Sequence, residues 1–201
     1  MKEAILGSTY FGPVQWYQKL NRYEHCYIEQ CDSFLKQTYR NRCIISTTAG
    51  TQALTVPMEH GVRLMKDIRI SDHGNWRHLH WQALVSAYGE SPFFEYYADD
   101  LHPFFEKKWE FLIDYEMEIV SKICELIDIR PNISLTNDFT LEYSDGTDDF
   151  RQKIVPKKLI TDESFQPKEY YQVYKEKYGF QANLSILDLL FNEGNESIFY
   201  L

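Results

Sequence analysis

Basic side chains are concentrated in one short stretch of the N-terminal half. Lys36, Arg40 and Arg42 lie there around Asn41, directly before an apolar run at residues 43–45. Side chains alternate along an extended segment, so these three even-numbered cations would point to one side. Arginine binds a carboxylate or phosphate through its planar fork, and lysine adds a point charge. The stretch predicts a site for a small anionic ligand, in which Asn41 positions a substrate hydroxyl or fixes the turn. A solvated basic edge strand explains the same residues equally well.

The segment after residue 75 places an ionisable ring near an indole. On a helix, Trp76 and His80 are four residues apart and share a face. Histidine titrates near neutral pH, so His80 is a candidate catalytic base and Trp76 a candidate substrate contact. Packing of the ring in the core is the competing explanation. His78 and His80 are two apart and point to different sides of a helix, so no metal site is predicted. The chain also lacks GxSxG, Walker and GxGxxG motifs.

The first thirty residues must position these groups. An apolar run at residues 4–6 leads into Tyr10-Phe11-Gly12-Pro13, and residues 14–20 follow with helical spacing. Proline suits the first turn of a helix, so we predict a strand, a tight turn and a helix, then a second strand at residues 25–30. Open N–H groups at such a helix start favour an anion. Tyr10, in the turn, is a candidate substrate contact.

The remaining periodicity divides the chain into a strand-rich half and a helical half. The sequence predicts an α/β or α+β fold in one domain spanning 1–201. Its N-terminal half forms a mixed β-sheet with one early strand–helix–strand unit, and its mainly helical C-terminal half packs on the sheet. Further strands are expected at residues 52–57, 67–71 and 132–136, and helices at 76–88, 116–129 and 185–191, with one or two more over 96–113 that are interrupted at Pro103.

Residues 142–169 form a long polar stretch with few apolar anchors, which predicts a lid or a surface loop. Beyond it, Tyr170, Tyr174 and Tyr178 recur every four residues, so their rings would line one helical face. Core packing explains such a stripe more often than ligand stacking.

The net charge of −9 is unevenly distributed. Residues 1–80 carry 10 Lys and Arg against 7 Asp and Glu, a net of +3, which leaves −12 for residues 81–201. An acidic protein without a dominant basic face is not expected to bind nucleic acid, and an anionic ligand would bind in the first half. The four cysteines show no CxxC pair, and no apolar run is long enough to span a membrane. We therefore expect reduced thiols and a cytoplasmic location.

These motifs, taken in order, make the sequence resemble the WbqC-like protein family. They are Tyr10-Phe11-Gly12-Pro13, the stretch from Lys36 to Asn41-Arg42, Leu54-Thr55-Val56-Pro57, Trp76-x3-His80, and Tyr88 with Pro92-Phe93. The family usually has Gln-Pro where this chain has Ser8-Thr9. Its acidic pair corresponds here to Gln30-Cys31-Asp32, which makes Asp32 a second candidate catalytic residue. The resemblance implies an association with bacterial surface polysaccharide and O-antigen synthesis.

Three functions follow from these observations. The first is an enzyme of cell-envelope polysaccharide or O-antigen sugar biosynthesis, a transferase acting on an anionic substrate such as a sugar nucleotide, a nucleotide or an acyl donor. The second is a nucleotidyltransferase-like enzyme that holds a nucleotide at the first helix. The third is a non-catalytic scaffold that uses the tyrosine stripe and the C-terminal aromatic residues. The residues point to no particular cofactor or oligomeric state.

Overall fold

The computed structural model describes residues 2–143, 146–157 and 161–201. At its centre, β1 (Glu3–Gly7), α1 (Val14–Arg22) and β2 (His25–Glu29) form the predicted strand–helix–strand unit. The two strands are parallel, with Gly7 opposite Glu29. Their carboxyl ends therefore lie side by side.

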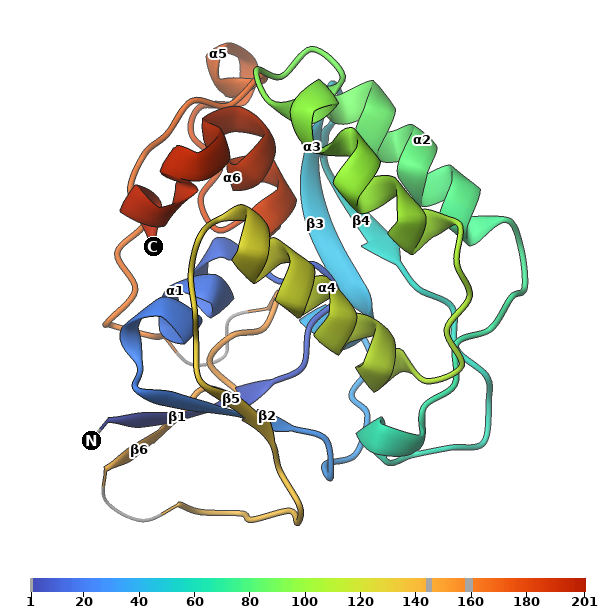
Figure 1. The fold of residues 1–201 in the computed structure, drawn as a ribbon, viewed down its shortest axis with the longest axis vertical. Helices are drawn as coiled ribbons and strands as arrows, with labels where there is room; N and C mark the ends of the chain where they lie inside the picture. The colour runs from blue at the N-terminus through green and yellow to red at the C-terminus, as the bar shows by residue number, and fades with distance from the viewer. Residues whose placement is uncertain (1, 144–145, 158–160) are drawn as a thin grey trace.

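Two short strands from later in the chain complete this sheet. β5 (Ile133–Leu135) pairs with β2, and β6 (Thr147–Asp149) pairs with β1. The order is β5-β2-β1-β6, and all neighbours are parallel (Figure 1). The expected strand near residues 132–136 is confirmed, whereas β6 lies in the stretch expected to be a polar loop.

An antiparallel hairpin stands apart from the parallel sheet. It consists of β3 (Arg42–Thr47) and β4 (Gly50–Thr55). The strand expected at residues 67–71 is reduced to isolated bridges, in which Ile70 meets Met58 and Arg69 meets Phe111. The α/β fold class is confirmed, with most of the described strands before residue 75 and most of the described helices after it.

The helices follow the predicted periodicity, with shifted ends. The one expected at 76–88 has those bounds and ends at Gly89, and the one expected at 116–129 starts and stops earlier. The helices after α1 are α2 (Trp76–Tyr88), α3 (Phe94–Leu101), α4 (Leu112–Leu126), α5 (Lys175–Tyr178) and α6 (Ile186–Glu193). Short 3₁₀ turns are η1 (Tyr39–Asn41), η2 (Met65–Asp67), η3 (His102–Phe105) and η4 (Gly194–Tyr200).

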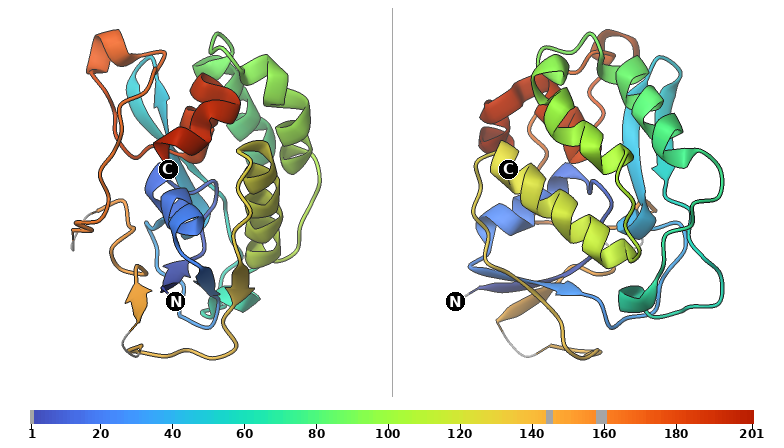
Figure 2. Two further views of the ribbon diagram at one scale, coloured as in Figure 1. Left: turned by 60° about the vertical axis from the view of Figure 1, so that its left-hand side comes forward. Right: turned by 45° about the vertical axis from the view of Figure 1, so that its right-hand side comes forward.

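The two faces of the parallel sheet have different environments. Ala4, Leu6 and Ile28 belong to the buried core that also contains residues of α1 and α4. These helices lie on one side of the sheet, and the chain between β5 and β6 crosses the other (Figure 2). Because side chains alternate, Ile5 and Tyr27 lie on that second face. Among the described residues, no helix is long and apolar enough to cross a membrane.

The expected helical stripe of tyrosines is wrong. Only Lys175–Tyr178 is helical, and the three hydroxyls bind different parts of the molecule. Tyr170 donates to Asp188 Oδ2, Tyr174 to the Ala87 carbonyl and Tyr178 to the Thr48 carbonyl. These separate bonds hold the segment across α2, α6 and the β3–β4 turn, which a single helix could not do.

We predict that the buried carboxylate of Asp188 is a main link between α6 and the rest of the fold. It accepts hydrogen bonds from the hydroxyls of Tyr88 at 2.9 Å and Tyr170 at 2.7 Å, and from Gln172 Nε2 at 2.8 Å. Asp188→Ala strands these buried donors, so urea denaturation should show a loss of about 3 kcal/mol in the free energy of unfolding. Asp99→Ala on the exposed side of α3 is the control, expected within about 0.5 kcal/mol of the parent. Equal stability of the two variants would contradict this role.

Candidate functional site

The carboxyl ends of parallel strands are where open α/β sheets bind ligands. In this protein Gly7, Ser8 and Thr9 follow β1 there, and a small hollow is lined by them together with Arg40 and Arg151. Both arginines are almost completely buried, with 4% and 8% of their surface exposed. Two buried guanidinium groups at this edge make it the strongest candidate for a functional site.

Arg40 is fixed by its own loop. Its Nη2 forms an ion pair with Asp32 Oδ2 at 2.7 Å, and its Nη1 donates to the Ser33 carbonyl. The Thr38 hydroxyl caps η1 by accepting from the Arg40 amide. The Arg40 Nε lies 3.9 Å from where a Cβ on Gly7 would sit. The side chain is thus held against the end of β1, with N–H groups beyond those two bonds.

Arg151 uses all of its donors within the protein. Its Nε and Nη2 bind the Asp149 carboxylate, its Nη1 binds Glu29 Oε2 and the Thr140 carbonyl, and its Nη2 also binds the Leu141 carbonyl. Five N–H bonds are available to a guanidinium group, and these contacts account for them. Arg151 therefore holds the site together, and Arg40 is the arginine with donors to spare.

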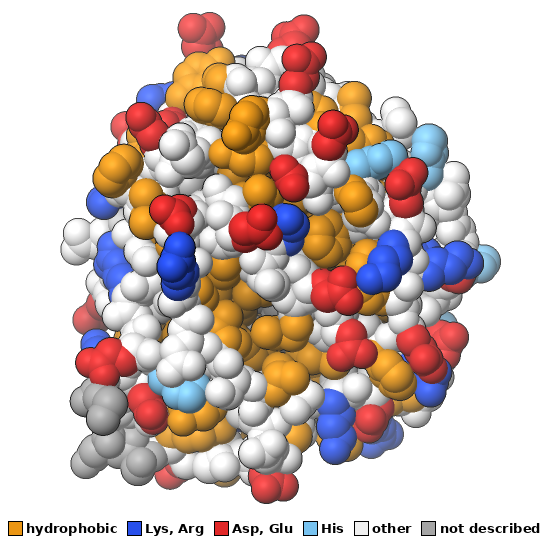
Figure 3. All heavy atoms as spheres, in the orientation of Figure 1, with side chains coloured by type: hydrophobic (Ala, Val, Ile, Leu, Met, Phe, Trp, Pro, Cys, Tyr) orange, Lys and Arg blue, Asp and Glu red, His pale blue; other side chains and the backbone are white. Residues whose placement is uncertain are grey.

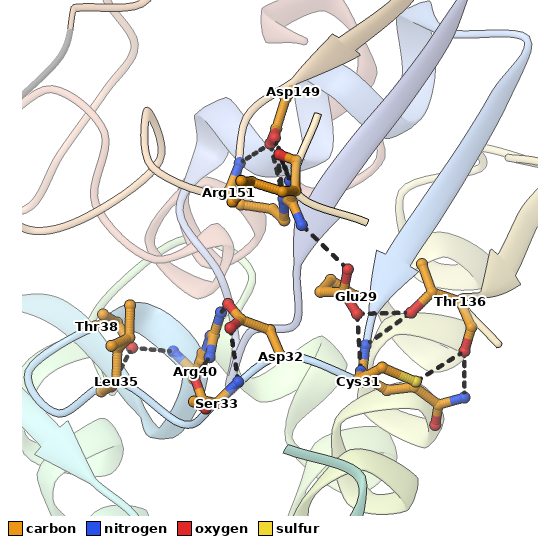
Figure 4. A network of polar contacts seen from close by, with 12 residues as sticks. Glu29, Cys31, Asp32, Ser33, Leu35, Thr38, Arg40, Thr136, Asp149 and Arg151 are labelled. Atoms are coloured by element: carbon orange, nitrogen blue, oxygen red, sulfur yellow. Dashed lines mark hydrogen bonds and ion pairs between the residues drawn. The ribbon is translucent and has the colours of Figure 1, made fainter. Parts of the chain in front are cut away.

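Glu29 connects this clamp to the edge of the sheet. It has no exposed surface, and its second oxygen accepts from the Thr136 hydroxyl and the Cys31 amide, each at 2.8 Å. Figure 4 shows the chain of contacts from Asp149 through Arg151 and Glu29 to Thr136, beside the separate pair of Asp32 and Arg40. The two guanidinium groups face three carboxylates, so the site has a net charge near −1. Such a balance disfavours a polyphosphate chain, whose several charges one guanidinium group cannot offset.

A buried acid lies behind this site on α4. Glu116 has no exposed surface, and neither carboxyl oxygen forms a hydrogen bond within the described residues. Burial raises the pKa of Glu116 well above its usual value, and the nearby Ser8 hydroxyl and Arg40 charge lower it only in part. Burial thus favours the protonated, uncharged form of the Glu116 carboxyl.

Residues 150–157, here called the closing segment, cover the hollow. Arg151, Ile154 and Val155 line it, and the remaining volume of about 10 Å³ has room for about one water molecule. Beyond this segment, Asp162 Oδ2 pairs with the buried Lys19 Nζ at 2.7 Å and accepts from Gln15 Nε2. A larger ligand requires the closing segment to move. Most of the stretch expected to be a polar lid or loop, 142–169, is described, and residues 144–145 and 158–160 of it lie outside the described residues.

The second group of predicted residues comes together in the aromatic core. The Tyr10 hydroxyl and His80 Nδ1 lie 2.9 Å apart, and the Trp76 ring meets the His80 ring edge-on at 5.2 Å. Phe11 adopts a positive φ of 42° in the turn that directs Tyr10 inward, an uncommon conformation for a bulky residue. Burial lowers the pKa of His80 to about 4, with the Thr55 carbonyl opposing this. His80 is thus a neutral, buried ring and a weak base.

The basic stretch does not form one extended run. Lys36 is exposed in a turn, Arg40 lies in η1 and Arg42 begins β3, because the chain reverses after β2 and must turn again into the hairpin. Asn41 Nδ2 donates to the Val56 carbonyl and fixes the turn. The Arg42 Nε is buried without a hydrogen bond among the described residues. Of these four residues, only Arg40 lines the hollow.

The start of α1 does not offer free amides to an anion. The Val14 amide donates to the Leu184 carbonyl and the Gln15 amide to Asn183 Oδ1. The C-terminal segment occupies the position expected for a phosphate. Within the described residues, no three His, Cys, Asp or Glu side chains are arranged to hold a metal ion.

A larger hollow of about 500 Å³ runs beside the C-terminal part of α4. Met117, Val120 and Ile133 contribute its apolar lining, and Figure 3 shows hydrophobic side chains around a hollow near the middle of this face. It contains none of the predicted site residues. On this face of the molecule, acidic side chains are scattered among other side chains and form no single patch.

The most informative site residues missing from the sequence prediction are Glu29 and Arg151. Glu29 ends a strand whose other residues read as ordinary alternation, and Arg151 stands in a charged stretch that resembles a solvated loop. Their separation along the chain hides the pairing. The available signal was Phe150, an apolar residue directly before Arg151 that marks a segment returning to the core.

The family to which the chain belongs is shown by its match to a family model. The model of the WbqC-like protein family matches residues 8–159 of the chain. The chain belongs to the WbqC-like protein family. This WbqC-like protein is also similar to Rv1507c, an uncharacterised protein of Mycobacterium tuberculosis (strain ATCC 25618 / H37Rv), at 29% identity over 100% of this chain and 97% of that relative. No solved structure gives a significant match. The matched range includes both Arg40 and Arg151.

We predict that His80 makes the stability of this WbqC-like protein depend on pH. The unfolded ring takes up a proton below about 6.5, whereas the folded ring stays neutral down to about 4. As the pH is lowered from 7 to 5, protonation of this ring in the unfolded state should therefore reduce the free energy of unfolding by about 2 kcal/mol. Urea denaturation of His80→Gln should show a smaller decrease in the free energy of unfolding between pH 7 and pH 5 than the parent shows. His78→Gln, at an exposed position, should retain the parent's decrease, and identical pH profiles for parent and His80→Gln would exclude the effect.

A second prediction concerns the closing segment. Burial raises the pKa of Asp162, but hydrogen bonds from Lys19, Ser164 and Gln15 outweigh it and lower this pKa to about 2. Asp162→Asn removes the ion pair, so trypsin should cleave the native protein after Lys153 and Lys157 about fivefold faster, as expected for about 1 kcal/mol of easier opening. Glu163→Gln removes an exposed charge next to it and should cleave at the parent rate. An unchanged rate in Asp162→Asn would show that the pair does not hold the segment.

Proposed function

We propose that this WbqC-like protein is a cytoplasmic bacterial enzyme of cell-envelope polysaccharide or O-antigen sugar biosynthesis, a transferase that binds the anionic group of its substrate at Arg40. The observation that carries this proposal is the buried guanidinium group at the carboxyl end of β1. It is held by Asp32 and Ser33 and has N–H groups beyond those two contacts. An arginine fixed in this way binds a phosphate or carboxylate with little loss of side-chain entropy.

Asp32 is the accessible acid–base group of this proposal. Its side chain is 19% exposed and directly contacts Arg40, so it can accept a proton from a substrate hydroxyl bound beside the anion. The exposed Lys36 adds positive charge near the entrance, and Arg42 supports the same turn. Tyr10, Trp76 and His80 form a buried wall behind this loop, where His80 has a positioning role through Tyr10.

The two alternative functions receive less support from the geometry. A nucleotidyltransferase-like site needs the start of α1, whose first amides are bonded to the C-terminal segment. A triphosphate would also meet the net negative charge around Arg40. The scaffold interface needs exposed aromatic residues, but Tyr170 and Phe191 are buried and Phe199 alone of the expected C-terminal residues is strongly exposed.

The test compares opposite changes at one ion pair. We measure the affinity for inorganic phosphate, pyrophosphate and sugar 1-phosphates by calorimetry. Arg40→Lys keeps the charge and loses the fork, so binding should weaken about tenfold. Asp32→Asn removes the competing carboxylate, so anion binding should tighten while any transfer activity falls. Arg63→Lys, on an exposed loop, should bind as the parent does.

Two results would contradict the proposal. One is equal binding of all anions by the parent and by Arg40→Lys, with both proteins folded by circular dichroism. The other is tighter binding of pyrophosphate than of any single phosphate group, which would favour the nucleotide-binding alternative.

A further inference from the structure

The face of the parallel sheet that the helices leave open contains a hollow of about 360 Å³. It lies between β1 and β2 on one side and the chain after β5 on the other. Its lining includes Ile5 and Tyr27 from the sheet, and Thr136, Asp138 and Tyr143 from that chain. The volume lies within the range of small-molecule binding sites.

Tyr27 provides a flat aromatic surface in this hollow. His25 is stacked against one face of its ring, with the ring centroids 4.2 Å apart and the planes 17° from parallel. His25 is itself fixed by a hydrogen bond between its Nε2 and the Ser134 hydroxyl. The Tyr27 ring is therefore held upright on the sheet, and among the described residues no aromatic ring covers its second face.

Polar side chains surround this ring with groups ready to bind a ligand. The side chains of Asn137 and Asp138 are exposed and form no hydrogen bond within the described residues, and the exposed Thr140 hydroxyl lies beside that of Tyr143. Glu3 supplies a second carboxylate near the amino end of β1, beside Thr147. Carboxylate, amide and hydroxyl groups together bind pairs of hydroxyl groups well. The two carboxylates repel an anion, so the ligand of this hollow is neutral and rich in hydroxyl donors.

We propose that this hollow binds a sugar ring, which packs its C–H face on Tyr27 and donates its hydroxyl groups to Asp138 and Glu3. A nucleobase would also stack on a tyrosine, but it offers few donors to two carboxylates. Arg151 lies between this hollow and the anion site, because it lines the anion site while its guanidinium group lies 5.2 Å from the Tyr143 ring and binds the Thr140 carbonyl. The sugar site does not depend on the proposed function. Only the assumption that a single ligand occupies this hollow and also reaches Arg40 rests on it.

The test uses saturation-transfer NMR with methyl pyranosides of glucose, galactose, mannose and N-acetylglucosamine at millimolar concentration. We expect at least one to receive saturation at its ring C–H protons in the parent protein. Tyr27→Phe keeps the aromatic surface and should bind within about twofold of the parent, whereas Tyr27→Ala should lose at least about tenfold in affinity. Asp138→Asn, at an exposed position, should weaken binding about fivefold. Tyr171→Ala, at an exposed tyrosine outside the hollow, is the matched control.

Several outcomes would overturn the sugar site. They are the absence of saturation transfer to every pyranoside, equal binding by folded Tyr27→Ala, and binding of nucleosides through their base protons instead. Sugar 1-phosphates separate this proposal from the proposed function. If Arg40→Lys removes only the extra affinity that the phosphate provides, both stand. If methyl pyranosides bind but neither free phosphate nor the phosphate of the sugar adds affinity through Arg40, the anion site alone fails. If free phosphate binds but no pyranoside does, the sugar site alone fails.

Discussion

The arrangement of this protein depends on a carboxylate that has no contact with water. Glu29 ends β2 inside the molecule, where an unpaired negative charge is strongly unfavourable, and Arg151 reaches it from more than a hundred residues away. Removal of one partner from such a pair typically costs about 3–5 kcal/mol. The pairing holds residues 146–157 against the sheet, so β6 forms beside β1 and the closing segment covers the candidate site. One ion pair thus favours the addition of β6 to the sheet and also keeps the candidate site at the carboxyl ends of the strands covered.

The same ion pair gives the two arginines different roles, one structural and one available to a ligand. Arg151 spends its donors on Glu29, Asp149 and two carbonyl groups, and it becomes part of the framework. Arg40 retains donors because its loop supplies only Asp32 and a single carbonyl. An overall acidic chain can therefore present one positive group to a ligand without a basic surface. The uneven charge of the sequence predicted a site in the N-terminal half, which contains Arg40, but only one of the three cations in its basic stretch lines the hollow.

Local patterns predicted those elements that depend on near neighbours. The strand, turn and helix around Pro13 and the end of α2 at Gly89 agree with the structure because capping and periodicity act over a few residues. The sequence failed where distant segments decide the conformation. Alternation predicted one face for Lys36, Arg40 and Arg42, but the Thr38 cap and the ion pair with Asp32 favour a 3₁₀ turn. β6 was missed because its three polar residues show strand character only beside β1.

The pairing of β1 with β6 also has a consequence for synthesis on the ribosome. Glu3 meets Thr147, so the partners are separated by about 140 residues. At roughly 5–20 residues per second, β1 waits on the order of ten seconds for this neighbour. During that time its outer N–H and C=O groups form an open edge to which another nascent chain can add a strand. The early strand–helix–strand unit thus has an edge that stays open to other chains during translation.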